Sequence, residues 1–307
     1  MRHRGPNGRG VHCNGYGAFG HTRLSIVDVA HGHQPILAGN DGKTGVICNG
    51  EIYNFKELRR KLSPKYAFKT RSDSETVLHL YRHMGPECLQ ELDGMFALCI
   101  FDGPNFMLAR DPIGIKPLYY AYHNGHLYFT SELGAMTLAK VGKNHEFPAG
   151  HYYTPEEAFE HYYQLPEVQN RYTEAEETIP LMRKALIQAV KKRLLADPEV
   201  PVGSFCSGGL DSSLVAAIAA EEIPNLHTFV VGTCDENGDY SDDLKASRIV
   251  AEHIGSTHHE YLITEEEYYE VLPVVIKELE SYDPALVRGA VPNYFTRSEE
   301  HTSELQS

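Results

Sequence analysis

The stretch from Cys206 to Ser213, with the sequence CSGGLDSS, constrains the fold of this chain more than any other. It follows the apolar run 200–205 and opens the amphipathic run 214–219, so we expect a strand, a turn of small residues and the start of a helix. Such a turn gathers backbone N–H groups and the positive end of a helix around an anion. Further strands alternate with helices after residue 222, which predicts a parallel α/β sheet in this half of the chain.

The residue types in this turn favour a phosphate as the anion. Gly208 and Gly209 allow a close approach of the backbone. Hydroxyl donors are added by Ser207, Ser212 and Ser213. Asp211 would repel a phosphate unless a divalent cation lies between them, so Mg²⁺ is expected there. The turn lacks the Gly-Lys-Ser/Thr ending of a Walker loop, which disfavours a kinase or GTPase. The alternative is a turn and helix cap without a ligand.

The octapeptide resembles the pyrophosphate loop, Ser-Gly-Gly-x-Asp-Ser, of the N-type ATP pyrophosphatases. The resemblance implies the parallel-sheet fold of the adenine-nucleotide α-hydrolases and binding of the β- and γ-phosphates of ATP, while a substrate oxygen attacks the α-phosphate. Adjacent parallel strands end at one edge of a sheet, which puts the end of strand 227–231 beside the loop for contact with adenine. The expected ATP-binding residues are Cys206, Ser207, Gly208, Gly209, Leu210, Asp211, Ser212, Ser213, Val231 and Gly232.

The first half of the chain has a different pattern, in which short strands outnumber helices. Two apolar strands are expected at 95–101 and 106–109, and Asn124-Gly125 predicts a hairpin. A strand at 45–48 is expected to stop at the turn Asn49-Gly50. Several strands are apolar on both faces, which predicts two sheets packed face to face with helices outside. Helices are expected to begin at side-chain caps on Asn54, Ser72 and Ser241.

These patterns predict two domains in the 307 residues. The first is expected at 1–163 and the second at 179–296. The Tyr- and Glu-rich stretch from Pro148 to about residue 178 has little periodicity, so we interpret it as the connection between the domains and bound the linker itself at 164–178. The final residues 297–307, RSEEHTSELQS, resemble a translated sequencing-adapter read-through, so we expect them to lie outside the fold.

Three polar clusters in the first half suit a small zwitterion. Arg23 could grip an α-carboxylate through two parallel hydrogen bonds, and Glu51 and Asp73 could take an α-ammonium group. The alternative is a buried ion pair, a turn and a helix cap.

Five segments of this half resemble the class II glutamine amidotransferases, in the same order: 2–6, 20–25, 49–54, 73–75 and 111–119. The resemblance implies an Ntn-type αββα sandwich. It also implies a glutamine pocket lined by Arg23, Leu24, Ser25, Ile26, Val27, Asn49, Gly50, Glu51 and Asp73. Asn49 and Gly50 would form the oxyanion hole, which stabilises the charge of the tetrahedral intermediate. The role of Lys116, in the segment 111–119, is left open.

The family's nucleophile is a cysteine at the mature N-terminus, and its α-amino group serves as the base. Met1 opens this sequence instead, and neither Cys13 nor Cys48 stands at the matching position. We therefore expect that the opening strand and nucleophile of the family are missing and that the chain as written hydrolyses no glutamine.

The order of the two halves resembles the glutamine-hydrolysing asparagine synthetases, a family of ligases. The resemblance implies ATP and Mg²⁺ as cofactors, with glutamine and aspartate as the other substrates, adenylation of the β-carboxylate of aspartate, and aspartate binding at Arg288. A later family loop is not in the sequence, so we expect this fragment to be inactive in both half-reactions. The alternatives are a β-lactam-synthetase-like enzyme and a non-catalytic nucleotide-binding fragment. The residues that would line a glutamine pocket are all present, which disfavours the β-lactam-synthetase-like enzyme.

The net charge, the hydropathy and the cysteine content limit the kinds of partner and the cellular location that we expect for this chain. The net charge of −14 argues against a nucleic-acid surface, and no apolar run approaches the ~20 residues that span a bilayer. The 6 cysteines show no zinc spacing and are typical of free thiols in a reducing cytosol. We expect a cytoplasmic enzyme without nucleic-acid or membrane partners, with a homodimer as a possible assembly.

Overall fold

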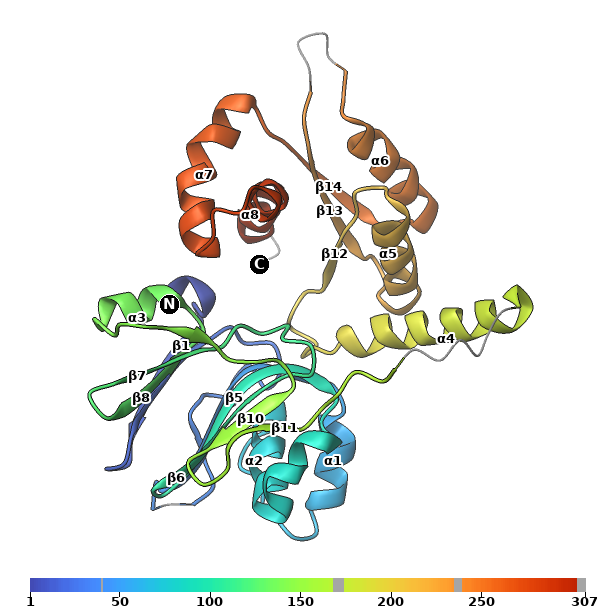
Figure 1. Cartoon of the computed structure of the whole chain (residues 1–307). Helices are drawn as coiled ribbons and strands as arrows, with labels where there is room; N and C mark the ends of the chain where they lie inside the picture. Colours follow the sequence, from blue (N-terminus) through green and yellow to red (C-terminus); the bar gives the residue numbers. More distant parts are fainter. Residues whose placement is uncertain (40, 168–173, 235–238, 303–307) are drawn as a thin grey trace. The chain divides into compact units, whose positions relative to one another are not determined.

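The computed structural model describes residues 1–39, 41–167, 174–234 and 239–302, with side chains as far as Phe295. The chain forms two compact units, Met1–Gln169 and Asn170–Ser307 (Figure 1). In the part of the chain that is described, no helix has the length and apolar character needed to cross a membrane.

The first unit is built on a six-stranded antiparallel sheet in the order β11-β10-β6-β5-β4-β3. Its strands are β3 (Ile36–Leu37), β4 (Thr44–Ile52), β5 (Gly94–Asp102), β6 (Asn105–Arg110), β10 (His151–Thr154) and β11 (Ala158–His161). A three-stranded sheet has the order β8-β7-β9, from β7 (Tyr119–His123), β8 (His126–Thr130) and β9 (His145–Glu146). A separate hairpin joins β1 (Gly8–Cys13) to β2 (Ala18–Arg23).

The two larger sheets and the hairpin enclose one apolar core. Phe19 of β2 stacks on Phe101 of β5 with ring centroids 4.1 Å apart. Leu118 and Phe147, which flank the smaller sheet, belong to the same cluster. Helix α2 (Asp73–Met84) packs on the outer face of β4, beside α1 (Phe55–Leu62). The third helix, α3 (Leu133–Leu138), buries Met136 against the smaller sheet, opposite α1 and α2 (Figure 1). The expected αββα layering is thus confirmed.

Several local predictions for this unit are confirmed and others are wrong. Both hairpins form, β5–β6 and β7–β8, at the expected turns. Strand β4 does not stop at Asn49-Gly50 but continues to Ile52, because β5 pairs with it throughout. The stretch after Pro148, which we interpreted as a linker, contains β10 and β11, and their pairing with β6 supplies the periodicity that sequence alone did not show.

The helix caps were correctly placed but not always for the expected reason. Ser72 accepts a hydrogen bond from the Ser74 N–H and caps α2 as predicted. Asn54 stands at the cap position of α1, but its side chain bonds the backbone of Glu91 and Asp93 instead. That bond anchors the turn after β4 to the residues before β5.

The second unit contains a parallel sheet in the order β12-β13-β14, as predicted. Its strands are β12 (Gly203–Phe205), β13 (His227–Gly232) and β14 (Thr257–Leu262). Helices α5 (Leu210–Glu222) and α6 (Asp242–Ile254) lie on one side of the sheet, and α7 (Glu265–Leu279) and α8 (Pro284–Thr302) on the other (Figure 1). Val287, Val291 and Phe295 of α8 pack against the sheet through Val231 and Tyr261.

Helix α4 (Ala175–Arg193) packs against α5. Its apolar side buries Val190 and packs Leu186 and Leu194 against the core of the unit, whereas Met182, which the helical period places on the same side, is 65% exposed. Only the second half of α4 meets α5, so the periodicity of the helix overstates its buried length. Ser241 stands at the cap position of α6, but its side chain makes no cap hydrogen bond to the helix, whereas Thr264 and Glu267 form a capping box at the start of α7.

Candidate functional site

The outer edge of β4 provides the most distinctive backbone geometry in the first unit. Phe96, which pairs with Gly50, directs its N–H and C=O to Asp111 and away from β4. Opposite residues of an antiparallel pair share this orientation, so the Gly50 N–H also points away from β5. The same alternation directs the N–H groups of Cys48 and Ile52 to that edge. Cys48 donates to the Gln34 side chain at 2.6 Å and Ile52 to the Asp73 carboxylate at 2.9 Å.

Between these two satisfied groups, the Gly50 N–H has no partner among the described residues. Strand β3 pairs with β4 only at Gly45 and Val46, so on the side of β4 away from β5 no strand pairs with Gly50. A Cβ at this position would lie 2.0 Å from the Met95 carbonyl oxygen, so only glycine fits. The edge therefore presents one oriented backbone donor at a position that excludes other residues.

Asn49 and Glu51 point to the opposite face of the sheet from Cys48, because side chains alternate along a strand. The Asn49 amide donates to the Ser131 hydroxyl at 3.3 Å, just beyond the end of β8. The amide donor of Asn49 and the N–H of Gly50 thus come from adjacent residues of one strand. An oxyanion hole requires such a pair of preorganised donors.

Two carboxylates lie close enough to interact at the end of this strand. Burial and the negative charge of Asp73 raise the pKa of Glu51 to about 8. Burial likewise raises the pKa of Asp73, although the Ile52 and Ser74 N–H groups oppose the shift. The positive charges of Lys116 and Arg23 offset the shift of Glu51 only in part. The pair therefore favours an additional cation.

Arg23 is buried, and its guanidinium holds backbone carbonyls of the following segment. Its Nη1 donates to the Val29 carbonyl at 3.0 Å, and its Nη2 donates to the Val27 and Asp28 carbonyls at 3.0 and 2.7 Å. The segment after β2 turns back around the guanidinium, and the Asp28 carbonyl also accepts from the His31 and Gly32 N–H groups. These bonds hold the loop that contains Val27 around Arg23. In the same segment Leu24 is exposed, and the Ser25 N–H donates to the Asn7 side chain.

The segment after β6 is organised by the fully buried Asp111 carboxylate. Its oxygens accept hydrogen bonds from four N–H groups, those of Phe96, Ile113, Ile115 and Lys116. This turn fixes the backbone of Lys116, whose charge acts on Glu51 and Cys48. Lys116, left without a role from sequence, belongs electrostatically to the carboxylate pair.

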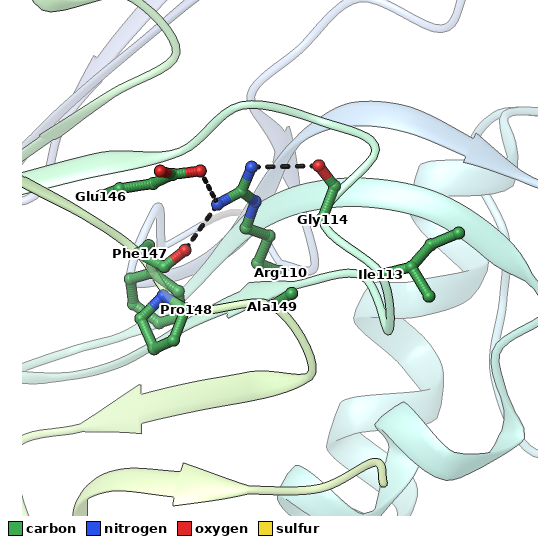
Figure 2. A pocket seen from close by; sticks show the side chains of 7 residues that line it. All are labelled: Arg110, Ile113, Gly114, Glu146, Phe147, Pro148 and Ala149. Atoms are coloured by element: carbon green, nitrogen blue, oxygen red, sulfur yellow. Dashed lines mark hydrogen bonds and ion pairs between the residues drawn. The ribbon is translucent and has the colours of Figure 1, made fainter. Parts of the chain in front are cut away.

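A cavity of about 340 Å³ lies beside this turn, lined by Arg110, Ile113, Gly114, Glu146, Phe147, Pro148 and Ala149 (Figure 2). Arg110 donates to Glu146 and to the carbonyls of Phe147 and Gly114, as the dashed lines in Figure 2 show. Its Nε donates to the Lys116 carbonyl at 2.8 Å. Since the chain itself satisfies this cation, the cavity offers no free charge to a ligand.

The cysteines of this unit do not supply an activated thiol. Cys48 is buried, and burial together with the charges of Asp73 and Glu51 raises its pKa well above the usual range. A thiol in this state is a poor nucleophile. Cys13 lies exposed on β1, and its neighbours His12 and Asn14 bond the backbone of Gly42 and Lys43 just before β4.

Sequence reasoning missed three residues that shape the edge of β4. They are Gln34, which bonds both backbone groups of Cys48; His21, whose Nε2 donates to the Cys48 carbonyl at 3.2 Å; and Ser131. His21 and Ser131 lie in or beside segments that the sequence did single out. Gln34 gave no signal, since its contact depends on the path of the chain into β3.

The phosphate-type loop of the second unit is placed as predicted between β12 and α5. Gly208 has φ +82°, and a Cβ there would lie 2.4 Å from Ala246, so the loop needs glycine to pass α6. Gly209 caps α5 without a side-chain bond, which leaves its N-terminal N–H groups available. The hydroxyls of Ser207 and Ser212 lie 3.1 Å apart, and the buried Ser213 hydroxyl has no partner among the described residues.

The other residues expected at the sites of the second unit lie in this loop, at the end of β13 and on α8. Cys206 is buried and donates its N–H to the Phe229 carbonyl, which joins the loop to β13. Val231 and Gly232 end β13, the strand beside β12. Leu210 and Asp211 are exposed on the first turn of α5. Arg288 is exposed on α8, which packs against β13.

A metal ion at Asp211 would need further ligands. No cluster of three or more His, Cys, Asp or Glu side chains suited to a metal occurs in the described part of the chain. One carboxylate on a helix start fits an ion whose other ligands are phosphate oxygens and water, which is the usual arrangement for Mg²⁺.

Comparison with known proteins identifies both halves. The family described as "Glutamine amidotransferase domain" matches residues 1–179, more than half of the chain. The chain belongs to this family. The family described as "Asparagine synthase" matches residues 181–304. The amidotransferase domain is therefore followed by an asparagine synthase domain, in the order that the sequence motifs predicted.

Curated relatives align with nearly the whole of this chain. A probable glutamine-hydrolyzing asparagine synthetase from Dictyostelium discoideum is 38% identical over 96% of this chain and 56% of its own length. Asparagine synthetase B from Escherichia coli is 39% identical over 96% of this chain and 55% of its own length. The chain thus spans about half the length of the curated relatives it matches. A solved glutamine phosphoribosylpyrophosphate amidotransferase from B. subtilis aligns with a TM-score of 0.44 and 16% identity, over 81% of this chain and 77% of that one.

Proposed function

We propose that the first unit binds L-glutamine at the outer edge of β4 and polarises its side-chain amide. The free Gly50 N–H, held beside a carboxylate pair that favours a cation, is the observation that supports this. The α-ammonium group of glutamine would supply the missing positive charge at Glu51 and Asp73. The Gly50 N–H and the Asn49 amide would receive the developing oxyanion of the γ-carboxamide.

The loop after β2 would form the wall of the glutamine pocket. Arg23 holds three consecutive carbonyls of this loop, so it would shape the wall that Leu24, Ser25, Ile26 and Val27 provide. The positive charge of Arg23 also acts on Glu51. When the pocket is empty, the positive charge of Lys116 would offset part of the negative charge of Glu51 and Asp73.

For the second unit we propose binding of ATP and Mg²⁺ at the loop from Cys206 to Ser213. The N–H groups at the start of α5 and the Ser213 hydroxyl would contact phosphate oxygens. Asp211 would hold the ion, which neutralises charge on the phosphates. Val231 and Gly232 would contact the adenine from the neighbouring strand.

We propose that the whole protein is a glutamine-hydrolysing asparagine synthetase, a ligase that adenylates the β-carboxylate of aspartate and displaces AMP with ammonia. Both family matches and the curated relatives support this. Arg288 would bind aspartate. We assign the glutaminase domain to 1–163, a linker to 164–178 and the synthetase domain to 179–296. Two of these bounds need correction against the structure: helix α4 already begins at Ala175, and α8 runs to Thr302, so residues 297–302 continue a helix and do not lie outside the fold. A cytoplasmic location, a homodimer and the lack of nucleic-acid and membrane partners remain parts of this proposal.

Isothermal titration tests the glutamine site. The 307-residue chain is expected to bind L-glutamine, and Asp73→Asn is expected to weaken binding about 10-fold or more, since it removes a charged partner of the ammonium group. Asp93→Asn, on an exposed residue, is the matched control and should bind as the unmodified chain does. Equal affinities of the two variants would contradict the assignment.

The nucleotide site has a parallel test. Asp211→Ala is expected to abolish the Mg²⁺ dependence of ATP binding and to leave the fold of the second unit intact. Glu252→Ala, on an exposed residue near the end of α6, is the control. ATP binding with unchanged Mg²⁺ dependence in Asp211→Ala would show that this residue holds no ion.

A further inference from the structure

At Gln34, just before β3, a side chain replaces the backbone in the hydrogen bonding to β4. The antiparallel register of Ile36 with Val46, continued by two residues, places Gln34 opposite Cys48. At that position the side chain of Gln34, and not its backbone, makes the ladder bonds. Its Oε1 accepts from the Cys48 N–H at 2.6 Å, and its Nε2 donates to the Cys48 carbonyl at 3.2 Å.

The backbone of Gln34 is directed elsewhere. Its carbonyl oxygen lies so close to β1 that a Cβ on Gly10 would be 2.0 Å away. The chain therefore leaves β4 at Gln34, while a primary amide remains to imitate one more strand residue. Residue 32, which the register would place opposite Gly50, instead donates its N–H to the Asp28 carbonyl.

This substitution has a direct consequence for Gly50. A strand that continued past Cys48 would bond the Gly50 N–H, whereas the Gln34 amide satisfies Cys48 and goes no further. The same amide donates to the Ser74 hydroxyl at 3.3 Å, which in turn donates to Asp73. The Gln34 side chain thus holds the backbone before Gly50 and connects it to the start of α2.

We propose that Gln34 is a positioning residue for amide recognition: it ends the β3–β4 ladder and holds the peptide of Gly50 so that its N–H meets the ligand's side-chain carbonyl. This inference rests on the proposed glutamine site. It assigns to Gln34 no contact with the ligand, and its specific effect is on the interaction that Gly50 makes. The bond to Ser74 connects Gln34 to Asp73 as well, but any change at Asp73 acts on the α-ammonium group and so alters the affinity for every α-amino acid alike.

Two amino acids separate these contributions. L-Norvaline has the α-groups and the carbon chain of L-glutamine but lacks the carboxamide oxygen and nitrogen. The ratio of the two affinities therefore measures amide recognition alone. A residue with a purely structural role would change the two affinities together.

The experiment compares Gln34→Leu and Gln34→Glu with the unmodified chain by titration calorimetry. Gln34→Glu keeps an acceptor for the Cys48 N–H and the size of the side chain, so it remains informative if Gln34→Leu does not fold. We expect Gln34→Leu to lower the preference for L-glutamine over L-norvaline about 5- to 10-fold, as for the loss of one well-oriented hydrogen bond, and Gln34→Glu to lower it less. Gln90→Leu, on an exposed residue of the same unit, should keep the full preference.

Two results would count against the proposal in different ways. If the unmodified chain prefers L-glutamine and both Gln34 variants keep that preference, or lose affinity for both ligands equally, the role of Gln34 is overturned. If the unmodified chain does not distinguish the two ligands, the proposed glutamine site fails and the role of Gln34 fails with it.

Discussion

The Asp73 carboxylate accepts a hydrogen bond from the Ile52 N–H at 2.9 Å, which ties the first turn of α2 to the end of β4. The same carboxylate accepts from the Ser74 N–H at 2.7 Å. Asp73 therefore has a structural bond on each oxygen, and its charge still raises the pKa of Glu51. One residue thus holds the edge of β4 in place and sets the electrostatics of the pocket beside it.

Gly50→Ala is expected to destabilise the first unit. The new Cβ would meet the Met95 carbonyl oxygen at 2.0 Å and the Phe96 Cα at 2.7 Å, both of them backbone atoms of the central strand β5. Neither atom can move without breaking the sheet, so we expect a loss of roughly 3 kcal/mol in the free energy of unfolding. Calorimetric unfolding of the chain measures it.

Gly20→Ala is the matched control for that change. Gly20 also lies within a strand, β2, but a Cβ there meets no atom within 4 Å. Its effect should stay within about 0.5 kcal/mol. Similar losses in both variants would show that strand glycines of this unit matter for backbone freedom and not for the close approach of β4 to β5.

The sequence predicted the layers of both units and the position of the phosphate-type loop, because hairpin turns, strand–turn–helix order and apolar runs are local signals. It failed where a long-range contact decided the outcome. Pairing with β5 carries β4 through Asn49-Gly50, and pairing with β6 makes strands of a stretch interpreted as a linker. The side-chain bonds of Gln34 and the burial of Arg23 depend on loop paths that no local pattern encodes.

Glu51→Gln is expected to change how stability depends on pH. In the folded chain Glu51 keeps its proton up to about pH 8, whereas the unfolded chain loses it near the ordinary value of 4.5. Between these values the unfolded state binds fewer protons. The contribution of Glu51 to stability is therefore fully present below about pH 4.5 and is lost as the pH rises toward 8.

The neutral amide of Gln cannot lose a proton, so the variant lacks this dependence. Relative to Glu51→Gln, the melting temperature of the unmodified chain should fall between pH 5 and pH 8, by roughly 5 °C for a unit of this size. Glu156→Gln, on an exposed residue, should follow the unmodified chain. Parallel melting profiles for all three proteins would contradict the raised pKa of Glu51.

Asp111→Ala is expected to loosen the turn before β7. Four backbone N–H groups would lose a buried acceptor, so we expect a loss of about 3 kcal/mol or more in unfolding free energy. Asp111→Asn keeps one oxygen and should lose less. Hydrogen exchange of the Ile115 and Lys116 amides reports the change, and Asp93→Ala is the exposed control. Unaltered protection of these amides in Asp111→Ala would show that the turn forms without the carboxylate.

Gly208→Ala is expected to damage the second unit and its nucleotide site together. The residue has φ +82°, which favours glycine, and a Cβ would lie 2.4 Å from the Ala246 Cβ and 2.6 Å from the Ser247 nitrogen. To relieve these contacts the loop must move away from α6, which displaces the N–H groups at the start of α5. We expect a loss of roughly 2 kcal/mol in the stability of the second unit and weaker binding of ATP with Mg²⁺.

Gly289→Ala is the control, because Gly289 is an exposed position in α8 where a Cβ meets nothing within 4 Å and alanine favours the helix. Hydrogen exchange followed by mass spectrometry resolves the two units. Faster exchange in α5 and α6, with the first unit unchanged, is the expected result; unchanged exchange there together with unchanged ATP affinity would contradict the tight packing of the loop on α6.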